Sequence, residues 1–204
     1  MQFPSIRLLN KQARVTLSLD GFGVNPSTFY RLFAVSNLKG WFSAVTSSSI
    51  LLFSPLHDLR LAFNSPTTPF SPKRSLSLSA TPTFIAYASA DTKLVVAFDA
   101  GQLAVYDTSA LFTPGSELIQ PLHFFESHSG PFRQIAPNPG TEPGIVDTLA
   151  VVRADGCVQL FNTNLQPQGG WAPSDFDSTP VAGTCCSFFH TTPPNFPFHS
   201  RLVP

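Results

Sequence analysis

The chain has 204 residues, and its 12 Lys and Arg balance its 12 Asp and Glu, which gives a formal net charge of zero. Such a chain lacks the basic stripe that tight binding to a phosphate backbone requires, so direct nucleic-acid binding is not expected. Only 12% of the residues are charged, 43% are hydrophobic, and Phe and Pro number 20 each. This composition predicts many short apolar strands separated by proline-containing loops, and hence an all-β fold.

The sequence also indicates a compartment. No stretch of about 18 apolar residues occurs, and residues 1–15 lack the basic segment, apolar core and cleavage site of a secretory signal. Cys157, Cys185 and Cys186 are odd in number, which does not fit a disulfide framework. We therefore expect a soluble protein that is neither secreted nor inserted into a membrane, in a reducing cytoplasmic or nuclear setting.

Along the chain, residues 1–31 are expected to be a lead-in with one candidate strand, Ala13–Leu19. A three-strand unit follows. Its expected strands are Leu32–Ser36, Trp41–Val45 and Ile50–Phe53. The next stretch, Phe63–Pro82, contains Pro66, Pro69, Pro72 and Pro82 among many Ser and Thr, so it is expected to be a connector that cannot hold a packed strand.

Two later stretches repeat one pattern of strand, glycine turn and second alternating strand, namely Val96–Asp107 and Val152–Asn162. Around this repeat we expect a second unit, in which Leu103 and Val105 share one face, and a third unit. The expected strands of the second unit are Phe84–Ala88, Lys93–Phe98, Gln102–Asp107 and an outer edge near Leu122–Glu126 after the linker Thr113–Pro121. Those of the third unit are Phe132–Ala136, Thr148–Val152 and Cys157–Phe161.

These units are typical of propeller blades. The expected fold class is an all-β, partial and open WD40-like β-propeller over residues 32–189, with about three blades and, at Val181–Phe189, the first strand of a fourth. Residues 190–204 are expected to form a Pro- and Phe-rich irregular tail. Closed propellers contain roughly 4 to 8 blades, so the expected explanation of an open ring of about three blades is a truncated chain or a partial gene model.

Three segments carry a resemblance to a known family. They are LFAVSNLKGWFSAVTSSSILLFSP, IAYASADTKLVVAFDAGQLAVYD and DTLAVVRADGCVQLF, and VAGTCCSFF follows them. Over about residues 30–190 the chain resembles the amino-terminal β-propeller of the large nucleoporin on the cytoplasmic face of the nuclear pore, in its fungal and animal versions. The matching elements are a strand that ends at Ser36-Asn37, the Lys39-Gly40 turn, the Ala154-Asp155-Gly156 turn and a strand that begins at Val181.

The resemblance implies a non-enzymatic, protein-binding scaffold in the nucleus, at the nuclear pore complex. In that family the propeller docks the DEAD-box RNA helicase that removes export factors from messenger RNA. The partners that the resemblance implies are thus this DEAD-box helicase and other nucleoporins, and it implies neither a cofactor nor a small-molecule ligand. It does not identify the residues that contact the helicase.

Residue types that carry chemistry are scattered. His123, Glu126 and His128 come nearest to a metal site, but two residues five apart on a strand point to opposite faces, so no metal is expected. The adjacent Cys185 and Cys186 alternate between faces and do not jointly clasp zinc without a second pair. Cys157 is expected to be a small hydrophobic residue, since the sequence offers no base to activate it.

Catalysis is not indicated elsewhere. No G-x-S-x-G elbow and no phosphate-binding loop occurs, so the chain is not expected to be an enzyme. Asp99, Asp107 and Asp155 lie at expected turns, where Asp is favoured structurally, and are expected to be turn formers. Ser71 precedes Pro72, Lys73 and Arg74 in a pattern that proline-directed kinases recognise. Ser-Pro and Thr-Pro pairs recur along the chain, so the composition alone predicts that one such pair will lie beside basic residues.

Two tryptophans are the aromatic residues best suited to anchor a partner. Trp41 lies within an expected strand, where core packing is the default. Trp171 follows Gly169-Gly170 and is expected to be exposed.

Two other functions stay open from the residues alone. A generic propeller adaptor, of the kind that scaffolds ubiquitin ligases or trafficking coats, has the same fold, because fold does not fix function. An enzyme that uses the central channel of a propeller would need clustered charged or metal-binding residues on the inner strands. The expected inner strands IAYAS and VAGTCCSFF carry none.

Overall fold

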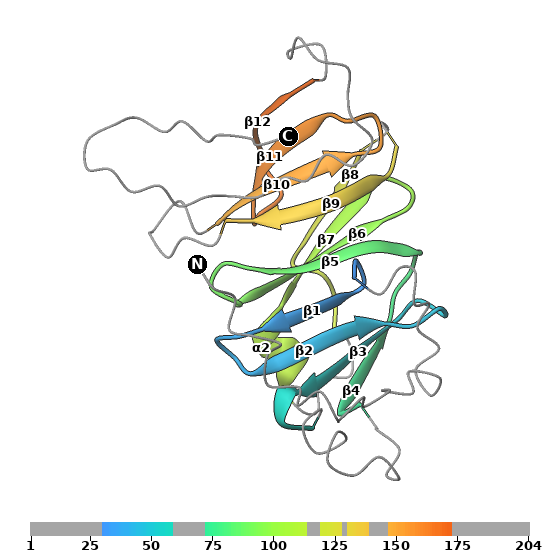
Figure 1. Cartoon of the computed structure of the whole chain (residues 1–204), viewed down its shortest axis with the longest axis vertical. Helices are drawn as coiled ribbons and strands as arrows, with labels where there is room; N and C mark the ends of the chain where they lie inside the picture. Colours follow the sequence, from blue (N-terminus) through green and yellow to red (C-terminus); the bar gives the residue numbers. More distant parts are fainter. Residues whose placement is uncertain (1–29, 59–71, 114–118, 128–129, 139–146, 173–204) are drawn as a thin grey trace, which may run out of the picture.

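The computed structural model describes residues 30–58, 72–113, 119–127, 130–138 and 147–172 (Figure 1). Within these ranges, twelve strands form three four-stranded antiparallel sheets, which we call blades 1, 2 and 3 in chain order. Blade 1 contains β1 (Phe33–Ser36), β2 (Trp41–Val45), β3 (Ile50–Pro55) and β4 (Arg74–Ser77). Blade 2 contains β5 (Pro82–Ala88), β6 (Lys93–Phe98), β7 (Gln102–Asp107) and β8 (His123–Glu126). Blade 3 contains β9 (Phe132–Pro137), β10 (Thr148–Arg153), β11 (Val158–Asn162) and β12 (Pro167–Trp171).

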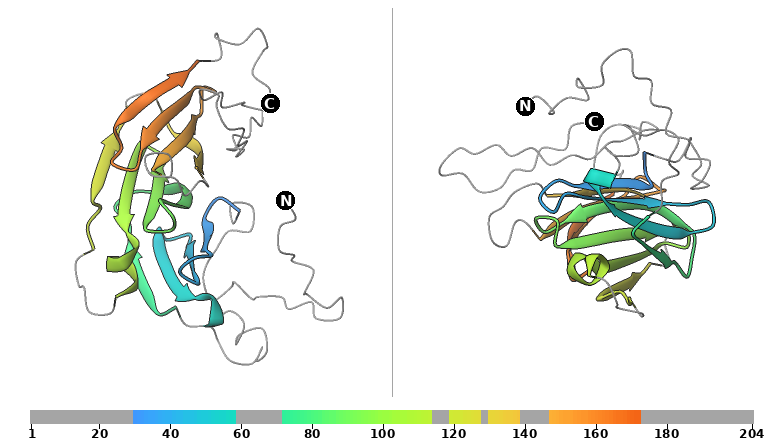
Figure 2. Two further views of the ribbon diagram at one scale, coloured as in Figure 1. Left: turned by 90° about the vertical axis from the view of Figure 1, so that its left-hand side faces the viewer. Right: turned by 90° about the horizontal axis from the view of Figure 1, so that it is seen from below.

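Each blade is a meander, because the strand order across each sheet follows the chain. The first strands of successive blades, β1, β5 and β9, lie next to one another, and the later strands of each blade lie further out. The three described blades follow one another along an arc that does not close into a ring (Figure 2). This is the arrangement of consecutive propeller blades.

Blade 2 is apolar on both faces. In β6, Leu94, Val96 and Phe98 pack in the cluster shared with blade 1, whereas Val95 and Ala97 pack in the cluster shared with blade 3. All five are at most 1% exposed. The uninterrupted apolar run of β6 therefore fits a strand that is covered on both sides.

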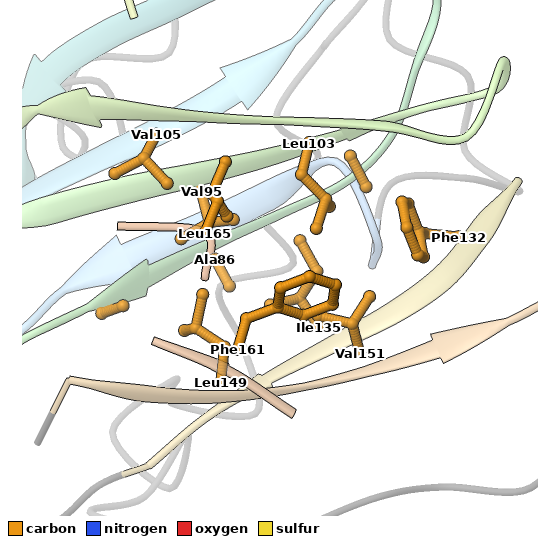
Figure 3. Close-up of a cluster of buried hydrophobic side chains, with 12 residues drawn as sticks. Ala86, Val95, Leu103, Val105, Phe132, Ile135, Leu149, Val151, Phe161 and Leu165 are labelled. Carbon is orange, nitrogen blue, oxygen red and sulfur yellow. The ribbon is translucent and has the colours of Figure 1, made fainter. Parts of the chain in front are cut away.

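The cluster between blades 2 and 3 joins side chains from the two facing sheets (Figure 3). Val95, Leu103 and Val105 of blade 2 pack against residues of blade 3, and the ring of Phe125 meets that of Phe161 edge-on, with the ring centres 5.0 Å apart. The members from blade 3 are Phe132, Ile135, Leu149, Val151, Phe161 and Leu165.

The cluster between blades 1 and 2 also includes a short helix, α2 (Thr108–Phe112), which follows β7. The ring of Phe112 stacks on Trp41 with the centres 4.4 Å apart and 11° between the planes. Arg74 of β4 donates to the carbonyl oxygens of Ala110 and Leu111, each at 2.9 Å. The helix thus ties the outer part of blade 1 to blade 2.

The predicted fold class is confirmed. Every expected strand within the described residues is present with bounds within two residues of the prediction, and Leu103 and Val105 share one face. The candidate strand Ala13–Leu19, the expected first strand of a fourth blade at Val181–Phe189 and the tail 190–204 lie outside the described residues.

Three elements correct the predictions. The stretch Phe63–Pro82 was expected to hold no strand, but Arg74–Ser77 forms β4 and pairs with β3. Its residues alternate between half-buried and exposed, and Leu76 packs on the cluster between blades 1 and 2, so pairing with β3 and this apolar contact hold the strand despite the neighbouring prolines. The helix α2 and the strand β12 are the other two elements that were not predicted from the sequence.

Candidate binding rim

One rim of the described blades is held together by side-chain hydrogen bonds that cross from blade to blade. We call it the clasp rim. It consists of residues 36–40, which end β1 and lead to β2, residues 89–92 between β5 and β6, Asp147 before β10, and Thr163 after β11.

The first clasp joins blade 1 to blade 2 through Asp91. Its carboxylate oxygen Oδ2 accepts a hydrogen bond from Oγ of Ser36 at 3.1 Å and another from the backbone N–H of Leu38 at 2.9 Å. The hydroxyl of Ser36 in turn accepts from the N–H of Lys39 at 3.2 Å. The turn after β1 is therefore fixed in part by a residue of the next blade.

The second clasp joins blade 2 to blade 3 in the same manner. Oγ of Ser89 donates to the carboxylate of Asp147 and lies 3.3 Å from Oγ1 of Thr163. The backbone N–H of Thr163 donates to the carbonyl oxygen of Asp147 at 2.8 Å. In both clasps, a serine at the end of an innermost strand donates to an aspartate that shortly precedes the second strand of the following blade.

The turn between these two clasps has an unusual backbone. Ser89, Ala90 and Asp91 have φ values of 52°, 51° and 62°, in the left-handed region that residues other than glycine rarely adopt. Thr108 donates through Oγ1 to the carbonyl oxygen of Asp91 at 2.8 Å and through its N–H to that of Thr92 at 3.1 Å. Such conformations persist only where the surroundings determine them from several sides, as they do here.

The clasp rim presents both apolar and charged groups to solvent. Leu38, at the tip of the turn after β1, is 69% exposed. Asp107, which pairs with Lys93 next to the clasp rim, caps α2 by accepting from the N–H and hydroxyl of Ser109, each at 2.8 Å. The hydrogen bond from Ser109 holds the pKa of Asp107 below its ordinary value, and the positive charges of Lys93 and Lys39 act in the same direction. The arrangement suits binding through contacts of shape and charge.

The structure does not bring the suggested metal ligands together. In β8, the side chains alternate, with His123 half-buried and Glu126 exposed, and His128 lies outside the described residues. Across the described ranges, no three His, Cys, Asp or Glu residues are grouped so that they could hold a metal ion.

The aspartates and the cysteine that the sequence brought to attention take part in turns and strands rather than in a site. Asp99 and Asp155 lie in the turns before β7 and β11. The carboxylate of Asp155 accepts from the N–H of Cys157 at 3.0 Å and pairs with Arg153, which is the turn chemistry expected for Asp. Cys157 is half-buried. Cys185, Cys186 and Ser71 lie outside the described residues.

The two tryptophans are both half-buried. Trp41 stacks on Phe112 in the cluster between blades 1 and 2, as expected for a strand residue. Trp171 was expected to be exposed, but this is wrong: it ends β12, pairs with Val158, and packs on the apolar cluster of blade 3. The glycines before it place the backbone in an edge strand rather than in a free loop.

Sequence reasoning missed the residues of the clasps, Ser36, Ser89, Asp91 and Asp147. Each is a common turn residue, and the partners are 55 and 58 positions apart, so no local pattern marks them. The signal that was available is the recurrence of a serine at the end of successive innermost strands, in Val35-Ser36 and Ala88-Ser89.

Comparisons with known proteins agree with the propeller blades seen in the structure. Residues 26–169 match the family model described as NUP159/214 beta propeller. No curated protein matches the sequence. In the part of the chain that is described, no helix is long and apolar enough to cross a membrane.

Two solved structures share this fold. A chain of the S. cerevisiae complex described as Dbp5 bound to Nup159, Gle1, IP6 and ADP matches with a TM-score of 0.50 and 17% identity, over 70% of this chain and 33% of that chain. A chain of the Mitotic Checkpoint Complex matches with a TM-score of 0.50 and 11% identity, over 70% of this chain and 39% of that one. The aligned part of this chain thus spans only 33% and 39% of the lengths of the two chains.

Proposed function

The chain belongs to the NUP159/214 β-propeller family, and on that premise we propose that it is a non-enzymatic nucleoporin segment that docks a DEAD-box RNA helicase during export of messenger RNA. The family match over residues 26–169 carries this proposal. The similar yeast assembly, which contains Dbp5 and Nup159 together, favours the same class of partner. The setting that follows is the cytoplasmic face of the nuclear pore complex, with other nucleoporins as further partners.

We place the docking surface on the clasp rim. Propeller loops are effective binding sites when a rigid scaffold holds them, because less conformational entropy is lost on binding. The turn after β1 meets this condition, since Asp91 fixes its backbone from the next blade while Leu38 stays 69% exposed. Lys39, the next residue, is exposed and would lie in the polar rim of such an interface.

The proposed domain organisation follows the sequence. Residues 1–31 form a lead-in, residues 32–189 the incomplete propeller and residues 190–204 an irregular tail. No cofactor and no catalytic residue belongs to this function, which relies on surface complementarity.

The test is binding of the full chain to the export helicase, measured by isothermal titration with the helicase in its ATP-bound and ADP-bound states. We expect Leu38→Asp to weaken binding by about 10-fold or more, as loss of an interface anchor does. Phe124→Asp is the matched control, because Phe124 is 52% exposed but lies on the outer edge strand β8, away from the clasp rim.

Each outcome has a defined meaning. Absence of helicase binding by the unchanged chain, in both nucleotide states, contradicts the proposed function and favours the generic adaptor. Binding that Phe124→Asp weakens and Leu38→Asp does not contradicts the placement on the clasp rim, while the proposed function stands.

A further inference from the structure

The strand β8 is the outer edge of blade 2. Within the described ranges it pairs with β7 and with no further strand, and it lies at the outer margin of the arc of blades (Figure 2). An edge strand offers a row of backbone N–H and C=O groups to any other strand that can approach it. The side chains of the edge therefore decide whether another strand pairs with it.

The outer edges of blades 1 and 3 carry features that hinder such pairing. In β4 the exposed side chains are Ser75 and Ser77, and Lys73, whose side chain is 62% exposed, precedes the strand. The strand β12 begins with Pro167, and a register shift interrupts its pairing with β11. Lys, Pro and irregular pairing are common protections of an edge strand.

The edge of β8 carries apolar side chains instead. Leu122, just before the strand, and Phe124 within it are 48% and 52% exposed, whereas no large apolar side chain is exposed on β4 or β12. Phe124 pairs with Ala104, whose side chain packs toward blade 1, so the exposed row lies on that face. Phe125 lies on the other face, where its ring meets Phe161 of blade 3. Thus β8 is anchored on one face and exposes apolar groups on the other.

The backbone of β8 leaves two residues facing outward. The N–H of Ser127 donates to the carbonyl oxygen of Gly101 at 3.0 Å, which places the backbone groups of Ser127 on the side of β7. Because these groups alternate between the two edges of a strand, those of Phe124 and Glu126 point away from β7. Leu122 lies before the strand and departs from this alternation, since its N–H donates toward β7 at 2.7 Å. Phe124 therefore combines outward backbone groups with an exposed ring.

We propose that β8 pairs antiparallel with β8 of a second copy of this chain, about a two-fold axis that passes between the two Phe124 residues. In this register the N–H of each Phe124 donates to the carbonyl oxygen of the other, and the two rings become neighbours. Glu126 then lies opposite Leu122 of the other copy, so no two carboxylates face each other. The formal net charge of the chain is zero, so net charge does not keep two copies apart.

A contact through so short a strand is weak. The strand β8 has four residues, whereas a standard protein interface uses about 20 to 30 residues on each side. We therefore expect a monomer–dimer equilibrium that depends on concentration rather than a permanent dimer.

The first test is sedimentation velocity of the full chain from micromolar to millimolar concentrations. The sedimentation coefficient should rise from that of a monomer toward that of a dimer and no further, because a two-fold contact closes on itself. Phe124→Asp should weaken dimerisation about 100-fold, since it costs about 10-fold in each copy and places two carboxylates at the axis. Leu38→Asp is the matched control, because Leu38 is 69% exposed but lies on the clasp rim, and it should leave the equilibrium unchanged.

The second test is disulfide cross-linking, which reports the register directly. With all three native cysteines replaced by serine, Phe124→Cys should form a linked dimer on oxidation, because opposite residues of paired strands lie about 5.5 Å apart at Cα. Leu122→Cys and Glu126→Cys should cross-link when the two variants are mixed. Neither should cross-link with itself, because four residues along a strand span about 13 Å, which a disulfide does not reach.

Several results would overturn the proposal. They include a chain that stays monomeric at every concentration and an assembly that grows beyond a dimer. Weakening by Leu38→Asp that equals or exceeds the weakening by Phe124→Asp places the contact elsewhere. Cross-linking of Leu122→Cys with itself contradicts the antiparallel register. Circular dichroism checks that Phe124→Asp keeps the β-sheet content of the parent, and if it does not, the cross-linking pattern decides. The helicase takes no part in either test, so the outcome is independent of the proposed function.

Discussion

A buried pair of hydroxyl groups gives the sharpest test of how blades 1 and 2 fit together. Ser43 in β2 and Tyr87 in β5 are hydrogen-bonded to each other through their hydroxyls, and the two residues are 0% and 8% exposed. Ser43→Ala leaves the hydroxyl of Tyr87 without this partner, and Tyr87→Phe does the same to Ser43. Each single substitution is expected to lower the free energy of unfolding by about 1 to 3 kcal/mol, the cost of an unmade buried hydrogen bond.

The double substitution behaves differently, because it removes donor and acceptor together. Replacing both partners by apolar groups of similar shape is nearly neutral, so the double variant should lie within about 1 kcal/mol of the parent. The resulting coupling energy, at least about 1 kcal/mol, is well above the scatter of roughly 0.5 kcal/mol seen for independent sites. It isolates the hydroxyl pair from the packing of the aromatic ring.

Urea unfolding of the parent, the two single variants and the double variant measures this coupling. Tyr106→Phe serves as the control, since Tyr106 is 6% exposed and packs in the same cluster as Tyr87. Each kcal/mol should shift the melting temperature by roughly 2 to 4 °C for a chain of this size. Additive effects of Ser43→Ala and Tyr87→Phe would refute the hydrogen bond across the blades.

Three further predictions concern pH, a turn and a helix cap. Burial raises the pKa values of Tyr87 and Tyr106 above the ordinary 10.0, so the urea midpoint should fall as the pH rises above 10, because the tyrosines of the unfolded chain ionise first. A midpoint that does not change between pH 10 and pH 11 would be evidence against their burial. Gly101→Ala should cost about 1 to 3 kcal/mol by thermal melting, because its φ is 82° and an added Cβ would lie 2.5 Å from a backbone carbonyl oxygen of the link to β9. Gly40→Ala, at φ 68° with open space around it, should cost less, and equal costs would contradict the steric argument. Asp107→Ala should lower the free energy of unfolding by about 0.5 to 1 kcal/mol at pH 7 through loss of the cap on α2. Because the pKa of Asp107 is lowered in the fold, the difference in urea midpoint between parent and variant should shrink as the pH falls below 3.8. A difference that persists unchanged at pH 3 would argue against the cap.

The strands that sequence reasoning predicted well are those whose own residues specify them. The apolar run of β6 lies between turn residues and is covered on both faces, so its composition alone identifies it. The strand β12 is the opposite case. Its sequence PQGGW has low strand propensity, and Gly170 is required because an added Cβ would lie 2.7 Å from the carbonyl oxygen of Val158. That close approach is a property of the paired sheet and leaves no pattern in the sequence.

The candidate binding rim was less predictable than the fold for a related reason. Apolar periodicity reports which face of a strand is buried, but it does not report which distant turn a polar side chain reaches. Ser36 and Asp91 are each ordinary turn residues, and their hydrogen bond exists only because β1 and β5 lie side by side. The family resemblance predicted a binding platform without indicating these residues.

The two kinds of contact between blades have different consequences for binding. The apolar clusters hold the sheets together, but apolar contact is non-directional and does not by itself fix the positions of the turns. The clasps are directional, and the turn of residues 89–92 takes part in both, since Asp91 accepts from blade 1 and Ser89 donates to blade 3. Its left-handed backbone costs on the order of 1 kcal/mol or more per residue, which is offset by contacts to blade 1, to blade 3 and, through Thr108, within blade 2. Loss of blade 3 would remove the hydrogen bond from Ser89 to Asp147, so the full set of contacts that fixes this turn requires all three blades.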